Sequence, residues 1–137
     1  MERTLVLIKP DGVERGFVGD IITRFEHRGL KIAGLKILRA SRDLAEEHYA
    51  PHRGKDFFEG VVEFITEGPV VAMVLAGENA IVLVRHMMGP LNPIEAMPGT
   101  IRGDFTTELR RNLVHGSDSI ESSDREIPIW FHESELV

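Results

Sequence analysis

The sequence predicts an α+β domain built on a four-stranded antiparallel sheet. Three apolar-rich runs indicate buried strands over residues 3–9, 30–40 and 70–76, and the segments between them carry apolar residues at helical spacing. Leu113 and Val114 supply a short fourth strand. The order of elements favours a ferredoxin-like βαββαβ arrangement with helices on one face of the sheet, a helical hairpin and a long loop as additions.

The first strand is predicted by residues 5–8, which are apolar without a break, as is typical of a strand covered on both faces. Pro10-Asp11-Gly12 then provides the turn chemistry that ends it. From Val18 to Phe25, apolar side chains recur at the spacing of one helix face, which predicts the first long helix. The isoleucine and leucine residues of 30–40 predict the second strand.

Two helices follow the second strand and form the predicted hairpin. Ser41 opens a short helix that extends through Tyr49, and apolar residues from Phe58 to Ile65 set up an amphipathic partner. After the third strand, Asn79 can cap a helix that runs to Met88.

Residues 89–103 break the pattern with three prolines and three glycines, a long connection of the kind that is usually functional in a compact domain. Beyond it, Ser123-Asp124-Arg125-Glu126 matches a capping box, so the last helix is expected around Ser123 to Phe131. Pro128 conflicts with this, because proline is tolerated only near the first turn of a helix. Either the helix starts later than Ser123 or it bends at the proline.

The composition predicts one folded domain spanning residues 1–137. Hydrophobic residues make up 42% and charged residues 28%, and the formal net charge of -6 argues against a general role on nucleic acid or a membrane surface. The absence of cysteine excludes disulfides and thiolate metal sites. No apolar stretch reaches the ~18 residues that a membrane span needs, and we expect a cytoplasmic protein.

The motif Asn-Leu-Val-His-Gly-Ser-Asp at residues 112–118 places His115 at the end of a short buried strand, with a glycine that leaves little bulk over the ring. Such a histidine can be a nucleophile towards phosphorus, although packed or hydrogen-bonded histidines are more common. Lys9, Arg85 and Arg102 lie on separate elements, as a phosphate site requires. Each of these cations alone is equally consistent with solvated surface.

Other features leave alternatives open. Phe57 could stack on a nucleobase or pack in the core, and Glu126 could cap the last helix or orient His115, with the spacing favouring the cap. His48 and His52 are four residues apart, but a proline between them interrupts the helix, so no zinc site is expected. The glycine-rich phosphate loop and the dinucleotide fingerprint are both absent.

Together these motifs resemble those of nucleoside diphosphate kinases, and the resemblance covers essentially the whole chain. The carboxyl-terminal end of the chain is similar to that of the short prokaryotic members. The matching segments are Arg3-Thr4, Ile8 to Val13, Gly68 to Met73, Pro98 to Phe105 and Asn112 to Asp118.

The resemblance implies ping-pong exchange of the γ-phosphate between nucleoside triphosphates and diphosphates through a phosphohistidine on His115. It implies that Lys9, Arg85 and Arg102 face the phosphates, and that Asn112 with Lys9 binds the ribose hydroxyls. Mg²⁺ is expected on the nucleotide phosphates, with few or no protein ligands. A homo-oligomer, either a tetramer or a hexamer, is also implied.

For the remaining site residues, the resemblance implies that Phe57 stacks on the base, which tolerates any base and so explains broad specificity. Tyr49 and Glu126 would support the lysine and the histidine, and Ser117 would help to hold Glu126. One position departs from the family: Leu91 stands where such kinases place a threonine whose hydroxyl meets a phosphate. Losing one neutral donor costs on the order of 1 kcal/mol, so we expect an active enzyme.

Two other functional hypotheses remain open from the sequence. The first is a nucleotide-binding oligomeric scaffold whose catalysis is weakened by Leu91. The second is nucleic-acid binding, which rests on Arg110-Arg111 and the loop arginine, residues more simply explained as a solvated helix end and a phosphate clamp.

Overall fold

The computed structural model describes residues 1–137 and contains one four-stranded sheet in the order β2-β3-β1-β4. All three strand pairs are antiparallel, which confirms the predicted class. The strands are β1 (Glu2–Ile8), β2 (Lys31–Arg39), β3 (Pro69–Gly77) and β4 (Val114–Gly116). β1 lies at the centre, where Leu7 pairs with His115 of β4.

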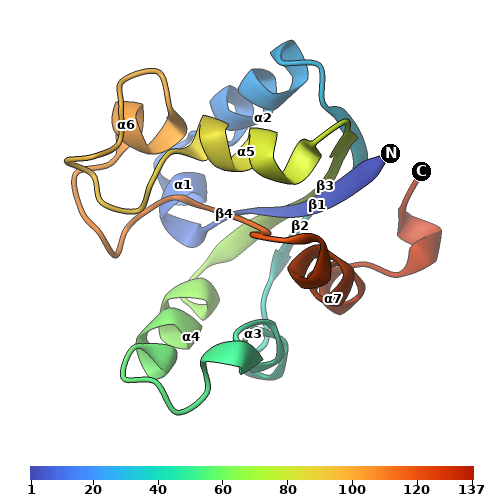
Figure 1. The fold of residues 1–137 in the computed structure, drawn as a ribbon. Helices are drawn as coiled ribbons and strands as arrows, with labels where there is room; N and C mark the ends of the chain where they lie inside the picture. Colours follow the sequence, from blue (N-terminus) through green and yellow to red (C-terminus); the bar gives the residue numbers. More distant parts are fainter.

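Helices cover both faces of the sheet, as Figure 1 shows. None of them has the length and apolar character that a membrane crossing requires. The helices are α1 (Pro10–Glu14), α2 (Val18–His27), α3 (Arg42–His48), α4 (Phe58–Thr66), α5 (Ala80–Met88), α6 (Ile101–Phe105) and α7 (Ile120–Trp130), with short 3-10 helices at Ala50–His52 and Glu133–Glu135.

The expectation of helices on one face is therefore wrong, and the reason lies in β1. Alternate residues of a strand point to opposite faces, so its unbroken apolar run feeds two cores. Val6 and Ile8 join the core under α2 and α5, while Leu5 and Leu7 join the core under α3, α4 and α7.

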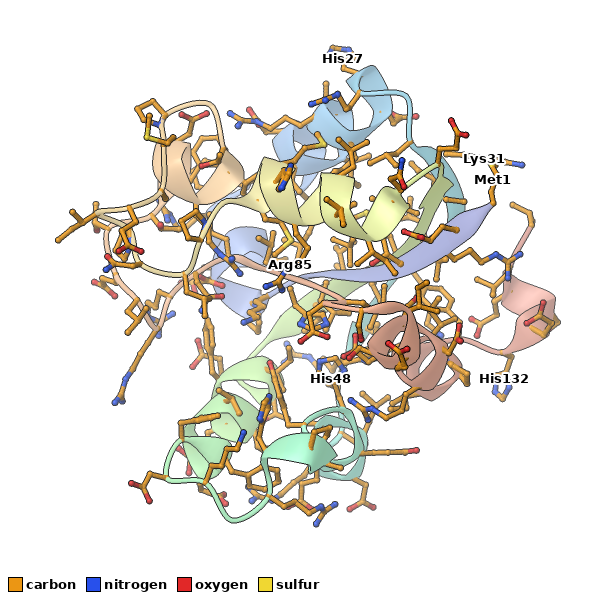
Figure 2. All side chains as sticks on the ribbon, in the orientation of Figure 1. Met1, His27, Lys31, His48, Arg85 and His132 are labelled. Carbon is orange, nitrogen blue, oxygen red and sulfur yellow. The ribbon has the colours of Figure 1, made fainter.

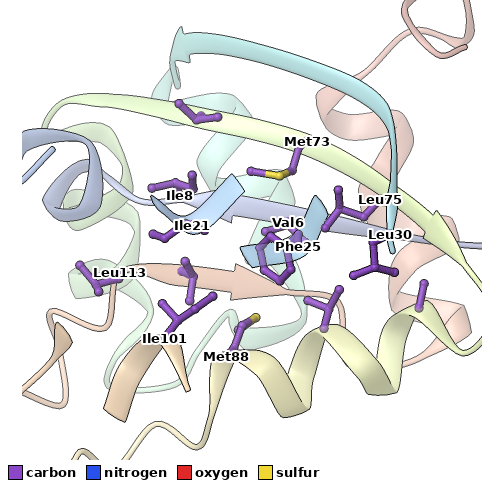
Figure 3. Close-up of a cluster of buried hydrophobic side chains, with 14 residues drawn as sticks. Val6, Ile8, Ile21, Phe25, Leu30, Met73, Leu75, Met88, Ile101 and Leu113 are labelled. Atoms are coloured by element: carbon purple, nitrogen blue, oxygen red, sulfur yellow. The ribbon is translucent and has the colours of Figure 1, made fainter. Parts of the chain in front are cut away.

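The core under α2 and α5 anchors the segments that carry the candidate site (Figure 3). Ile101 of α6 and Leu113 before β4 are both fully buried in it, beside Met88 at the end of α5. Burial of such a side chain stabilises the fold by about 1.5–3 kcal/mol. The segments that contain Arg102 and His115 are therefore held to the same core.

Several boundaries differ from the predictions. The fourth strand runs from Val114 to Gly116, so Leu113, which was predicted within it, lies just before it. Pro10-Asp11-Gly12 begins the helix α1 instead of forming only a turn, and the connection 89–103 ends in α6. Asn79 adopts a left-handed conformation, with φ 54°, and its side chain makes no capping bond. Glu2 of β1 fulfils that role, because its Oε1 accepts from the N–H of Ile81 at 2.8 Å.

The last helix starts three residues earlier than its predicted capping box. Ser119 caps α7 by accepting from the N–H of Ser122, so the cap assigned to Glu126 is wrong. Pro128 lies inside the helix near its end. It removes one hydrogen bond, and the ladder continues with the bond from the N–H of Phe131 to the carbonyl of Ile127. The earlier start leaves Glu126 free to contact β4.

Candidate active site

His115 is the middle residue of β4, and its side chain is 20% exposed. Its Nε2 lies 2.9 Å from Oε1 of Glu126, and the hydroxyl of Ser117 donates to the same oxygen at 2.7 Å. An ionised carboxylate only accepts hydrogen bonds, so the proton of the neutral ring belongs on Nε2. Nδ1 then keeps its lone pair, which makes it the nucleophilic atom of the ring.

Glu126 is held in its ionised form by this arrangement. Burial alone would raise the pKa of its carboxyl group, but the hydrogen bonds from His115 and Ser117 outweigh burial and leave the pKa below its ordinary value. Ser117 is fixed in turn, because its Oγ accepts from the N–H of Leu5 at 3.3 Å. The orientation of the histidine is therefore set by α7 and by β1 as well as by β4.

His48 is a neighbour of His115 that the sequence analysis did not place in the site. It is buried at the end of α3, its ring lies edge-on to that of His115 with centroids 4.6 Å apart, and its Nδ1 accepts from Nε1 of Trp130 at 3.1 Å. Burial, with a smaller effect from His115, lowers the pKa of His48 well below its ordinary value. His48 is therefore an uncharged side chain that packs against His115.

His48, His115 and Glu126 also bring ligand-type atoms within 4.8 Å of one another. The predicted interruption between His48 and His52 is confirmed, since α3 ends at His48. Each member of this cluster already has a hydrogen-bond partner, and the set has two imidazoles and one carboxylate, whereas Mg²⁺ prefers oxygen ligands. We assign the cluster to orienting His115.

Lys9 follows β1 directly and is buried. Its Nζ donates to Oδ1 of Asn112 at 2.8 Å, and Nδ2 of Asn112 donates to the carbonyl of Leu109 at 3.1 Å. Burial and the positive charge of Arg102 lower the pKa of Lys9 to about 8. The lysine is therefore charged at neutral pH but loses its proton unusually easily.

Arg102 is buried and binds three backbone carbonyls that surround β4. Nε donates to Asn112 at 3.1 Å, Nη1 to Gly89 at 2.8 Å and Nη2 to Val114 at 2.7 Å. A guanidinium has five N–H groups, so this set leaves two for a ligand. The sequence analysis anticipated only a phosphate clamp, and the structure shows that Arg102 also fixes the backbone of the site.

Arg85 reaches from α5 towards β4, as Figure 2 shows, and Nη1 donates to the carbonyl of Gly116 at 3.2 Å. Burial and the charge of Arg85 lower the pKa of Arg102 to about 10. Arg85 therefore repels Arg102, and Arg102 repels Lys9. All three cations donate to residues 112–116, so they converge on one region, where a bound polyanion would relieve their repulsion.

A hollow of about 340 Å³ lies against two of these cations. Its lining residues are Arg85, His86, Gly89, Pro90, Leu91, Met97, Thr100 and Arg102.

The two aromatic candidates lie on the α3–α4 hairpin. Phe57 precedes α4, is 44% exposed and contacts the ring of His52. Tyr49 is buried and lies edge-on to His48 with centroids 4.7 Å apart, and it makes no hydrogen bond to Lys9, the residue it was expected to support. The structure thus gathers the other predicted residues around β4 and leaves Phe57 beside them as an exposed ring.

This arrangement suits phosphoryl transfer. That reaction needs an in-line nucleophile and positive groups that neutralise charge on the phosphoryl oxygens, and little covalent chemistry from the protein. His115 supplies a free ring nitrogen, and cations that follow β1 or lie on α5 and α6 bind residues in or next to its strand.

Comparisons with known proteins agree with this chemistry. The family model for nucleoside diphosphate kinase matches residues 2–136. A nucleoside diphosphate kinase of Carboxydothermus hydrogenoformans is 58% identical over 137 residues, which cover all of this chain and 92% of that protein. One from Thermus thermophilus is 57% identical over the full length of both chains.

Solved structures extend the match to three dimensions. A halophilic nucleoside diphosphate kinase from Halobacterium salinarum, solved in complex with CDP, has a TM-score of 0.96 and 52% identity, with 99% of this chain and 91% of that chain covered. A family protein from Babesia bovis has a TM-score of 0.97 and 43% identity, with coverage of 100% and 93%. The chain therefore belongs to the nucleoside diphosphate kinase family and is a phosphotransferase.

Proposed function

We propose that the chain moves the γ-phosphoryl group of a nucleoside triphosphate to a nucleoside diphosphate through Nδ1 of His115. In the first half-reaction, the Nδ1 lone pair forms a bond to the γ-phosphorus while the bond to the β–γ bridging oxygen breaks, and the diphosphate leaves with that electron pair. A second diphosphate then attacks the phosphohistidine in reverse. The contact between Nε2 of His115 and Glu126 carries the proposal, because it frees Nδ1.

Glu126 and Ser117 act behind the ring. When Nδ1 is phosphorylated, the ring becomes positively charged, and the carboxylate of Glu126 stabilises that charge through the proton on Nε2. Ser117 keeps the carboxylate aligned by donating to the same oxygen. Tyr49 supports the site indirectly, because it packs against His48.

The nucleotide is held on the other side of the ring. Lys9, Arg85 and the two remaining N–H groups of Arg102 bind phosphate oxygens, which relieves the repulsion among these cations. Asn112 and Lys9, already joined at 2.8 Å, bind the ribose hydroxyls, and the exposed ring of Phe57 stacks on the base. Stacking needs no base-edge contact, so several bases are accepted.

Kinases of this family use the magnesium complex of the nucleotide. The phosphate oxygens suit Mg²⁺, which takes oxygen ligands in near-octahedral geometry, and the ion lowers the charge that the cations must neutralise. We assign no residue of this chain as a direct ligand of the ion.

A labelling experiment tests the proposal. The protein is incubated with Mg²⁺ and ATP carrying a labelled γ-phosphate, and an acid-labile, base-stable phosphoprotein is expected, which releases its label on addition of GDP. His115→Ala should remain unlabelled, whereas the matched variant His132→Ala, at an exposed position outside the site, should label normally. Persistent labelling of His115→Ala would refute the assignment.

We also propose that residues 1–137 act as one catalytic domain in a homo-oligomer. Both cores share one sheet, and the exposed edge strand β2 carries Ile37 at 64% exposure, while the loop before α6 carries Ile94 at 93%. Such apolar edges and patches are usually covered. Light scattering should give the mass of a tetramer or hexamer, and Ile37→Lys or Ile94→Lys should reduce it. A monomeric mass for the unmodified chain would contradict this part. The cytoplasmic location stays a prediction.

A further inference from the structure

Leu113 has a conformation that its side chain disfavours. Its φ is 69°, in the left-handed region, although it is a fully buried residue with a Cβ atom. It stands between Asn112, which binds Lys9, and the strand that carries His115. The backbone angle at this one residue therefore sets the relative positions of the ribose-binding amide and the nucleophile.

Two hydrogen bonds from the β1–α1 junction hold this residue. The N–H of Leu113 donates to Oδ2 of Asp11 at 3.1 Å, and its carbonyl accepts from the N–H of Lys9 at 2.7 Å. Gly12 permits the close approach, because a Cβ there would lie 2.8 Å from Cγ2 of Ile8 and 3.4 Å from the carbonyl of Leu113. The junction thus binds both the N–H and the carbonyl of Leu113, the residue with the left-handed backbone.

Burial of the Asp11 carboxylate at this position is energetically unfavourable. It is buried, its Oδ1 has no hydrogen-bond partner, and burial raises the pKa of its carboxyl group. Asp11 lies in the first turn of α1, where a carboxylate is favourable, but a buried carboxylate with an unmet oxygen still costs free energy. The charged acceptor at Oδ2 binds the N–H of Leu113 and, together with the bond from Lys9 to Asn112, links the β1–α1 junction to the segment carrying His115.

We propose that Asp11 is a positioning residue of the reaction: its buried carboxylate holds Leu113 in the left-handed conformation and thereby places Asn112 and His115 relative to each other. The proposal rests on the proposed function of His115. Its hydrogen bond reaches the site through the backbone of Leu113, and its negative charge also raises the pKa of Lys9 against the lowering by burial.

Kinetics of three variants test this role. Asp11→Ala removes the acceptor, and we expect kcat/KM for ATP–GDP exchange to fall about tenfold or more, with a lower kcat and a higher KM. Asp11→Asn keeps an acceptor for the N–H of Leu113 and should stay within about threefold of the unmodified chain. Glu2→Ala is the matched control, because it removes another carboxylate that binds a backbone N–H, at the far end of β1. It should leave kcat/KM unchanged.

Repeating the Asp11 substitutions in the variant Leu113→Gly separates an effect on positioning from an effect on stability. Glycine adopts left-handed angles without strain, so in Leu113→Gly the effect of Asp11→Ala on kcat/KM should shrink to about twofold or less. If Asp11→Ala does not fold, Asp11→Ser, whose shorter side chain cannot reach the same N–H, replaces it in both backgrounds.

The outcomes are distinct. A lower melting temperature with unchanged kcat/KM in Asp11→Ala, or an equal kinetic loss in both backgrounds, overturns the proposal. Failure of the unmodified chain to form a phosphoenzyme overturns the proposed function instead, so the two failures are told apart by one labelling reaction.

Discussion

Lys9 gives the pH dependence of the enzyme a specific form. Burial, followed by the charge of Arg102, lowers its pKa from 10.5 to about 8. At that value the ammonium group is about nine-tenths protonated at pH 7, half at pH 8 and a tenth at pH 9. If the charged form binds the nucleotide, kcat/KM should fall about fivefold between pH 8 and pH 9.

The assay is kcat/KM for ATP–GDP exchange from pH 6.5 to 9.5, because this ratio reports groups of the free enzyme. Arg102, with its pKa near 10, stays charged over most of this range. Lys9→Arg should have lower activity but no break near pH 8, since arginine does not titrate there. A flat profile to pH 9.5 for the unmodified chain would refute the reasoning.

Deprotonation of Lys9 does not destabilise the fold, so unfolding would not produce this fall in kcat/KM. The pKa of Lys9 is lower in the folded chain than in the unfolded chain, so between about pH 8 and 10.5 the unfolded chain holds more protons. The contribution of this group to the free energy of unfolding therefore rises with pH in that window. Melting curves at each pH should show no decrease in stability attributable to Lys9 over the range in which kcat/KM falls.

Three further changes should alter the kinetics in different ways. Phe57→Ala removes a stacking surface worth about 1–3 kcal/mol and should raise KM about tenfold for purine and pyrimidine nucleotides alike; an effect on one base only would contradict stacking. Ser117→Ala leaves Glu126 with one fewer donor and should slow phosphoenzyme formation a few-fold in rapid-quench experiments; an unchanged rate would remove Ser117 from the site. Leu91→Thr restores a hydrogen-bond donor to phosphate and should raise kcat a few-fold. If the unmodified chain has no measurable turnover and Leu91→Thr creates it, the alternative of a nucleotide-binding scaffold with weakened catalysis is favoured.

Much of the fold could be predicted, because local patterns determine it. The apolar runs of β1 and β3 are covered on both faces, so they needed no partner information to be recognised as strands. The histidine of β4 was found for a similar reason, since its motif is short and contiguous. Its acceptance as a nucleophile depended on the family resemblance, which the comparisons confirm.

The contacts of the site could not be predicted, because they join residues far apart in sequence. The capping box at Ser123 favoured a capping role for Glu126 over contact with His115, whereas Ser119 caps the helix and Glu126 contacts the histidine. Nothing local links His48 to His115 or Asp11 to Leu113, which are 67 and 102 residues apart. Long-range packing of the sheet and helices brings these groups together.

The central claim is that Glu126 holds the proton on Nε2 of His115 and leaves Nδ1 to attack. Nuclear magnetic resonance of the phosphoenzyme, with ¹⁵N-labelled histidine and detection of ³¹P, measures which ring nitrogen is bonded to phosphorus. The structure predicts coupling of phosphorus to Nδ1 of His115, with a proton retained on Nε2. Coupling to Nε2, or to a nitrogen of any other histidine, would contradict the account.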